Sequence, residues 1–79
     1  MDILACILYR SIGGARKTNL IYKCNLSLSQ FKSYSGFLIE QGLLIKRVVK
    51  AGSSYRVFET TDRGKRFIEE YRKLLDILS

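Results

Sequence analysis

A chain of 79 residues has room for one small domain, and its 14 basic against 7 acidic residues leave a net charge of +7, which indicates a polyanionic partner. The sequence contains no histidine, no phosphate-cradling glycine loop and no spaced pair of carboxylates, so it predicts a protein that is not an enzyme. With two isolated cysteines and no Cys-x-x-Cys pair, it also predicts no metal site and no cofactor.

The positive charge is concentrated in the first two-thirds of the chain. Residues 1–57 contain nine basic and two acidic residues, whereas residues 58–79 contain five of each. A basic body with a neutral tail predicts that the body binds a polyanion, although charge kept for solubility alone would give the same balance. The apolar start is short and lacks a basic leading region, and no run approaches membrane-spanning length, so we expect a cytoplasmic protein that does not enter a membrane.

The first two predicted helices support a core. Asp2 is placed to cap the first helix, and Gly13-Gly14 ends it. Its apolar face consists of Ile3, Leu4, Ile7 and Leu8. A shorter helix is expected from about residue 16 to residue 24, with Leu20, Ile21 and Cys24 turned inward and Arg16, Lys17 and Lys23 turned outward.

The third predicted helix, over residues 27–42, has both of its ends marked. The Ser27 hydroxyl and the Gln30 side chain form a reciprocal capping box, and Gly42 can take the left-handed conformation that closes a helix. The stripe that faces the core consists of Leu28, Phe31, Ser35 and Leu38, flanked by Tyr34 and Ile39. The opposite face consists of the small and polar residues Ser29, Lys32, Ser33, Gly36 and Glu40. Following a short helix and a turn, this pattern predicts the recognition helix of a helix-turn-helix.

Two runs rich in β-branched and aromatic residues, 43–49 and 55–60, predict a β-hairpin whose flexible turn is residues 50–54. Its basic side chains are Lys46, Arg47, Lys50 and Arg56. Beside a recognition helix, such a hairpin would present a basic wing to a phosphate backbone. An edge hairpin kept soluble by its charges would have the same composition.

Thr61 is placed to cap a last helix, which carries a heptad-like apolar seam. We predict a dimer interface made of Phe67, Tyr71, Leu74, Leu75 and Leu78, with Ile68 beside it. The same stripe could instead pack on its own domain. The sequence thus divides into a domain over residues 1–61 and a dimerisation helix over residues 62–79, and a chain that buries so little surface would gain stability from a second subunit.

Three passages carry a family resemblance: Lys17-Thr18-Asn19-Leu20-Ile21-Tyr22-Lys23-Cys24-Asn25-Leu26-Ser27, the stretch from Tyr34 through Gly42-Leu43-Leu44, and Thr61-Asp62-Arg63-Gly64-Lys65. The last is similar to a Thr-x-x-Gly-Lys start of a terminal helix, and the middle one to a helix that ends in Gly-Leu. These passages resemble the archaeal winged-helix family that includes the small coiled-coil DNA-binding proteins of Sulfolobus and many predicted archaeal transcriptional regulators. The resemblance implies an α+β winged helix-turn-helix, DNA binding and a homodimer built on the terminal helix.

The candidate DNA-binding residues fall into two groups. Those expected at base edges or nearby phosphates are Ser29, Gln30, Lys32 and Ser33. Those expected at phosphates are Arg16, Lys17, Lys23, Lys46, Arg47, Lys50 and Arg56, any one of which could instead be a solvated surface charge. The predicted helix from Ser27 to Gly42 contains no arginine, which argues for modest direct reading of bases.

The two cysteines, Cys6 and Cys24, are interpreted as small core residues, and a disulfide between them is the alternative. The sequence as a whole predicts a homodimeric transcriptional regulator that binds double-stranded DNA. A chromatin-like protein that coats DNA with little sequence preference, and a winged helix that binds another protein, remain open alternatives.

Overall fold

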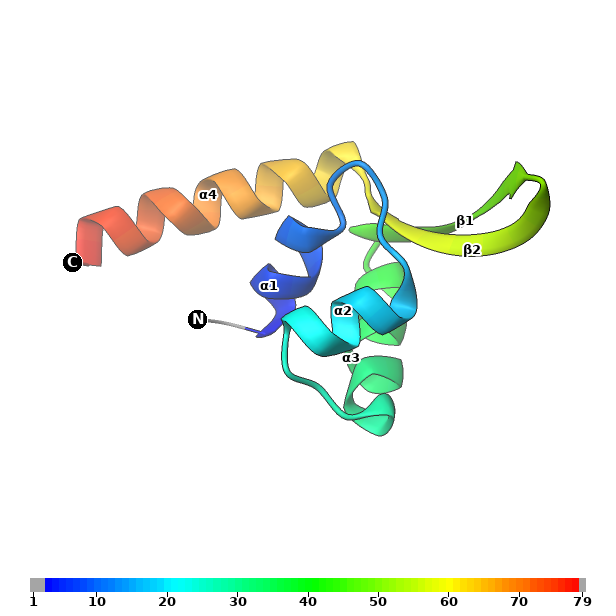
Figure 1. The fold of residues 1–79 in the computed structure, drawn as a ribbon. Coiled ribbons are helices and arrows are strands. Elements are labelled where there is room, and N and C mark those ends of the chain that lie inside the picture. The colour runs from blue at the N-terminus through cyan, green and yellow to red at the C-terminus, as the bar shows by residue number, and fades with distance from the viewer. Residues whose placement is uncertain (1–2, 79) are drawn as a thin grey trace.

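The computed structural model describes residues 3–78, which form helices and a two-stranded hairpin in the order α1–α2–α3–β1–β2–α4 (Figure 1). The elements are α1 (Ile3–Arg10), α2 (Lys17–Lys23), α3 (Leu28–Glu40), β1 (Leu44–Ala51), β2 (Ser53–Thr60) and α4 (Asp62–Leu78). The predicted α+β order of three helices, a hairpin and a last helix is confirmed. The predicted cap of α1, Asp2, lies outside the described residues.

The core lies where the first three helices meet the base of the hairpin. Its fully buried members include Ile7, Leu8, Leu20, Phe31, Leu38 and Leu44. The Phe31 ring meets the Phe58 ring edge-on, with 5.1 Å between their centroids, which joins α3 to β2. One predicted core residue was wrong, because Leu28 is 48% exposed. It belongs to the first turn of α3, which extends beyond α2 on the lower side of the molecule (Figure 1).

Both predicted ends of α3 are confirmed. The Gln30 backbone N–H donates to the Ser27 hydroxyl at 3.1 Å, and the Ser27 N–H donates to the Gln30 side-chain oxygen at 3.0 Å. At the other end Gly42 has a φ of +74°, and the N–H of Leu43 donates to the Leu38 carbonyl at 3.0 Å. This left-handed closure turns the chain directly from α3 into β1.

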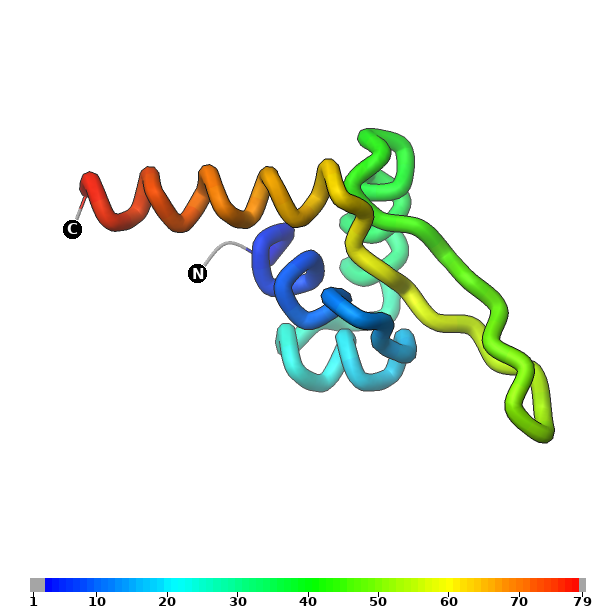
Figure 2. The backbone as a smooth tube through the Cα atoms, turned by 90° about the horizontal axis from the view of Figure 1, so that it is seen from above, coloured from blue at the N-terminus to red at the C-terminus, as the bar shows by residue number. Residues whose placement is uncertain are grey.

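The hairpin is longer than the sequence predicted. Its antiparallel register runs from Leu44 opposite Thr60 to Ala51 opposite Ser53, so the expected loop of residues 50–54 was wrong. Gly52 alone remains unpaired at the tip, where its φ of +80° reverses the chain. The ladder therefore continues almost to the end of the hairpin, which projects well away from the helices (Figures 1 and 2).

Hydrogen bonds join β2, at the base of the hairpin, to the helical body. In the segment between α1 and α2, the Ala15 N–H donates to the Phe58 carbonyl at 2.8 Å and the Phe58 N–H donates back to Ala15 at 2.7 Å. At the end of β2 the buried Thr60 hydroxyl donates to the Leu8 carbonyl, and the Thr60 N–H donates to the Ser11 carbonyl at 3.1 Å. The hairpin base is thus fixed to the end of α1 and to the chain that leads into α2.

The last helix starts against the core and then leaves it. The Thr61 hydroxyl accepts a hydrogen bond from the Gly64 N–H at 3.0 Å, which confirms the predicted cap, and donates one to the Gly42 carbonyl at 2.8 Å. The first half of α4 lies alongside α1 and buries Ile68, whereas the second half runs away from the body, opposite the hairpin (Figures 1 and 2). No helix within residues 3–78 combines the length and the apolar character needed to cross a membrane.

Gly64 allows the close approach of α4 to the chain before β1. A Cβ at this position would overlap the Leu43 carbonyl oxygen and would lie 2.6 Å from the Thr60 methyl carbon. We therefore expect Gly64→Ala to lower the free energy of unfolding by about 1–3 kcal/mol, because backbone atoms would have to move. Chemical denaturation followed by circular dichroism measures this loss.

The matched control is Gly36→Ala, also in the interior of a helix, where an added Cβ meets open space. This change should raise the free energy of unfolding by up to about 1 kcal/mol through better helix propensity. Equal stabilities of the two variants would contradict the proposed close approach at Gly64.

Candidate nucleic-acid interface

A hollow of about 670 Å³ lies between α3, the start of α2 and the inner face of the hairpin. Its walls include the apolar side chains of Phe31, Ile39 and Phe58, together with the small residues Ser35 and Gly36 of α3. These small side chains leave the hollow open along the helix.

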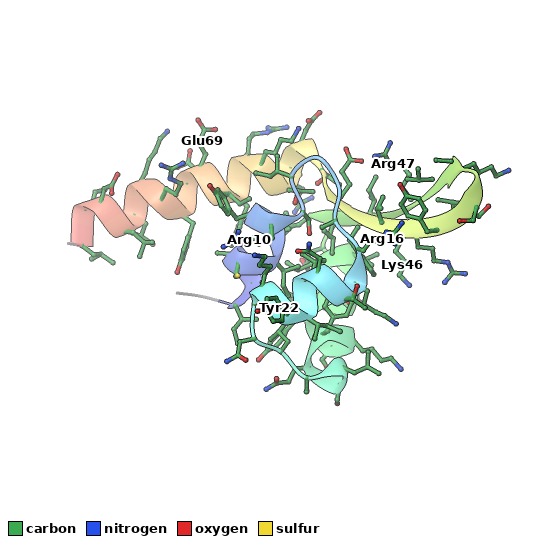
Figure 3. The ribbon with its side chains drawn as sticks, in the orientation of Figure 1. Arg10, Arg16, Tyr22, Lys46, Arg47 and Glu69 are labelled. Atoms are coloured by element: carbon green, nitrogen blue, oxygen red, sulfur yellow. The ribbon has the colours of Figure 1, made fainter. Side chains whose placement is uncertain are left out.

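Five of the predicted DNA-binding residues line this hollow: Arg16, Lys17, Lys32, Lys46 and Arg56. They come from the start of α2, from α3 and from both strands, and Figure 3 shows Arg16 and Lys46 where the hairpin meets the helices. No acidic side chain of the described residues contributes to its lining. Positive charges that converge from four elements without a compensating carboxylate create a potential that attracts an anion.

Arg16 is held in place by an aromatic ring of the hairpin. Its Cζ atom lies 3.9 Å from the centroid of the Tyr55 ring, which is a cation–π contact between the N-cap residue of α2 and strand β2. Stacking uses the face of the guanidinium plane and leaves its N–H edges able to donate to a phosphate. Sequence reasoning did not assign this role to Tyr55, because the two residues are far apart along the chain.

The chain forms three helices and then a hairpin, and the hairpin faces the third helix across a basic hollow. This arrangement is typical of one fold family. A comparison with protein families finds that the sequence pattern described as winged helix-turn-helix matches residues 1–79. The chain belongs to the winged helix-turn-helix family. Its fold is one that typically binds DNA, with α3 as the recognition helix and β1–β2 as the wing. No curated protein matches the sequence.

The recognition helix carries four predicted contacts, all of them exposed: Ser29, Gln30, Lys32 and Ser33. Only Lys32 lines the hollow, and the other three are not among its lining residues. The Gln30 side-chain oxygen already accepts the Ser27 N–H, and its NH₂ group remains the part available to a base. Gly36 and Thr18 also line the hollow, although the sequence did not single them out as contacts.

The two faces of the wing differ in charge. Lys46 and Arg56 line the hollow, whereas Arg47 points to the other side of the hairpin because successive side chains of a strand alternate (Figure 3). There the Arg47 guanidinium lies 2.6 Å from a carboxylate oxygen of Glu59. Of the two adjacent basic residues, only Lys46 therefore contributes its charge to the hollow. The charge of Arg47 lies on the other face and is offset by Glu59.

Two further predicted phosphate contacts lie outside the hollow. Lys50 is near the tip of the wing, opposite Ser54 in the ladder. Lys23 is at the far end of α2, with its ammonium 5.9 Å from the ring of the exposed Tyr22 (Figure 3). Both are exposed, so their predicted contacts would require DNA that extends beyond the hollow.

A second hollow of about 570 Å³ adjoins the first on the outer side of the stacked Arg16–Tyr55 pair, and both hollows include Thr18. It adds Arg10 and Asn19, which sequence reasoning did not assign to the site. Its polar groups, two guanidinium groups, two hydroxyls and an amide, suit hydrogen bonding to phosphate oxygens. Within residues 3–78, no three Cys, Asp or Glu side chains gather where they could hold a metal ion.

The predicted dimer interface is divided between two sides of α4. Tyr71 and Leu75 line a groove of about 360 Å³ between α4 and α1, whereas Phe67 lies on the side nearer the end of α3. The Phe67 and Tyr71 rings stack with centroids 6.3 Å apart. Leu74 and Leu78 are 52% and 73% exposed, so the end of the helix presents apolar side chains that its own domain does not cover.

The difference between Lys46 and Arg47 gives a test on adjacent residues. We expect Lys46→Ala to weaken binding to duplex DNA several-fold and to reduce the slope of log affinity against log salt by about 1, because one phosphate contact is lost. Arg47→Ala removes the same charge from the opposite face, where Glu59 pairs with it, and should leave the slope close to that of the wild type. Fluorescence anisotropy at several salt concentrations measures both.

Circular dichroism melting of each variant controls for loss of structure, since Arg47→Ala leaves the half-buried Glu59 carboxylate without its partner. A larger change in the salt slope for Arg47→Ala than for Lys46→Ala would mean that DNA lies on the outer face of the wing.

Proposed function

We propose that this protein is a sequence-specific DNA-binding transcriptional regulator that acts as a homodimer in the cytoplasm. The observation that carries the proposal is the basic hollow between recognition helix and wing, to which five basic side chains and no described acidic side chain contribute. The finer likeness to archaeal regulators, seen in the motifs at residues 17–27 and 61–65, is part of this proposal.

In the proposed complex α3 lies in the major groove. Its 13 residues correspond to a rod about 20 Å long and 10–12 Å wide, which a major groove about 12 Å wide can admit. The exposed Ser29, Ser33 and the Gln30 amide would then meet base edges or nearby phosphates. Because Lys32 is the only basic residue of α3, direct reading of bases is modest and much of the affinity comes from phosphates.

The hollow takes the sugar-phosphate backbone beside that groove. Lys32 approaches it from α3, Lys46 and Arg56 from the wing, and Arg16 and Lys17 from the start of α2. The Arg16 guanidinium, stacked on Tyr55, is already oriented before DNA arrives, which lowers the entropy lost on binding. Each phosphate contact releases counterions, so affinity should fall steeply with salt.

The homodimer is proposed to form through α4. Its exposed end carries Leu74, Leu75, Ile77 and Leu78, an apolar surface that water would disfavour in a monomer. The chain is small, so burial of this surface against a second copy would also add stability. A dimer related by a two-fold axis would read two symmetric half-sites.

A chromatin-like protein that coats DNA is the second candidate. It is favoured by the composition of α3, whose outer face is mostly serine and glycine and has no arginine. Such a surface fits closely against any groove but discriminates poorly between base pairs.

The test of function is anisotropy of labelled duplexes at several salt concentrations, with DNA from upstream of the protein's own gene compared with random sequence. A regulator binds the upstream DNA at least about tenfold more tightly, whereas a chromatin-like protein binds both equally. Absence of binding at low salt would refute both and leave a winged helix that binds another protein.

A dimer through the end of α4 predicts that the double variant Leu74→Glu with Leu78→Glu becomes monomeric, because buried carboxylates would face the partner helix. Sedimentation velocity measures the change. The matched control is Lys73→Glu, an exposed charge reversal on the same helix, which should keep the dimer. A wild-type protein that sediments as a monomer at micromolar concentration would contradict this part of the proposal.

A further inference from the structure

The end of α3 and the first half of α4 enclose a groove of about 430 Å³, which we call the α3–α4 groove. Phe37 and Gln41 line it from α3, and the buried Leu43 lines it from the turn between α3 and β1. The Phe37 side chain is 48% exposed, although it is large and apolar. The groove therefore has an aromatic wall that the rest of the domain does not cover.

The α4 side of the groove is a single stripe of that helix. Arg63, Arg66, Phe67 and Glu70 stand at positions i, i+3, i+4 and i+7, so they project from the same side of α4. The Phe67 side chain is 38% exposed. Each helix thus contributes one partly exposed aromatic ring, and two guanidinium groups lie beside these rings.

The positive charge of the α3–α4 groove is not neutralised by the domain itself. Within residues 3–78, neither Arg63 nor Arg66 forms an ion pair with a carboxylate. The Glu70 carboxylate lies 3.5 Å from the Lys73 ammonium, which offsets its charge. The two arginines therefore keep their N–H groups available to an acceptor from another molecule.

The two sides of the groove are held at a fixed separation. The Thr61 N–H donates to the Leu43 carbonyl at 3.0 Å, and the Thr61 hydroxyl joins the Gly42 carbonyl to the first turn of α4. Gly64 lets this turn approach the Leu43 backbone closely. A groove that is already formed loses little entropy when a ligand binds.

We propose that the α3–α4 groove binds an acidic amphipathic helix of a protein partner. Apolar side chains of that helix pack against the Phe37 and Phe67 rings. Carboxylates beside them accept charge-assisted hydrogen bonds from Arg63 and Arg66. A helix that lays its apolar face into a hydrophobic groove is a recurring mode of peptide recognition, and the two arginines select an acidic one.

Charge and chemistry separate this partner from two other candidates. The end of α4 from a second copy, residues 72–78, contains two basic residues and one acidic residue, so the arginines of the groove would repel it. The backbone of duplex DNA offers anionic oxygens to the arginines but no apolar side chains to cover the two phenylalanine rings. An acidic amphipathic helix matches both the charge and the apolar surface.

The α3–α4 groove lies on the flank of α3 opposite the basic hollow. Ile39 lines the hollow, whereas Phe37 and Gln41, two positions to either side of it, point nearly the opposite way because a helix turns by about 100° per residue. The two sites share no lining residue. The partner helix can therefore bind with or without DNA, and this inference does not depend on the proposed function.

The experiment titrates the full-length protein into fluorescein-labelled peptides of about 16 residues, long enough to form a helix, and follows anisotropy. The acidic probe carries Leu and Phe at helical spacing with Asp and Glu beside them. One control peptide has Lys in place of the acids, and the other has Ala in place of Leu and Phe. We expect only the acidic probe to bind. Absence of binding, or equal binding of either control peptide, would overturn the proposal.

Variants of the protein then locate the binding site. The double variant Arg63→Ala with Arg66→Ala should weaken binding of the acidic probe at least about tenfold, because charge-assisted hydrogen bonds are lost. The matched control Arg72→Ala removes an exposed arginine of the same helix outside the groove and should bind the probe as the wild type does. Melting near the wild-type temperature shows that the variants fold.

Three further results would contradict the proposal. Unchanged probe affinity in the double variant would place the peptide elsewhere on the protein. A wild-type dimer that becomes monomeric in the double variant would assign the groove to a second copy. A decrease of about 2 in the slope of log DNA affinity against log salt, or displacement of the probe by single-stranded oligothymidine, would assign it to nucleic acid. Failure of the wild type to bind DNA would refute the proposed function and leave these results unaffected.

Discussion

Two adjacent threonines at the end of the wing fix the arrangement on which the other features depend. The Thr60 hydroxyl donates to the carbonyl of Leu8 in α1, and the Thr61 hydroxyl donates to the carbonyl of Gly42 at the end of α3. The first bond is buried, and it gives the Leu8 carbonyl a second donor besides the Ser11 N–H. Together the two bonds hold the end of β2 against α1 and against the end of α3. The orientation of the wing relative to the recognition helix is thereby fixed.

The basic hollow follows from that angle combined with the alternation of side chains along a strand. With the hairpin base fixed, Lys46 and Arg56 point toward α3 and Arg47 points away, where Glu59 offsets its charge. Phe58 supports the same face through its contact with Phe31 in the core. Packing thus determines which basic side chains converge. Part of the net charge of +7 is therefore concentrated in the hollow and is not spread evenly over the surface.

The last helix combines two roles in its two halves. Near its start Gly64 and Ile68 pack closely on the domain, so this part of α4 belongs to the core as much as the first three helices do. Beyond Tyr71 the apolar side chains of Leu74, Ile77 and Leu78 are mostly exposed, while Leu75 still borders the groove beside α1. The predicted boundary at residue 61 therefore falls at a point in the sequence where the packing of the domain continues into α4.

The sequence alone determined the elements and most of their ends, because a capping box such as Ser27–Gln30 or a left-handed glycine such as Gly42 depends on residues only a few positions apart. It also identified, through charge and periodicity, the five basic side chains that line the hollow. Only the tertiary structure decided which of the basic residues converge and that Arg16 stacks on Tyr55. These contacts join residues remote in sequence, and no local pattern encodes the orientation that packing and long-range hydrogen bonds give them.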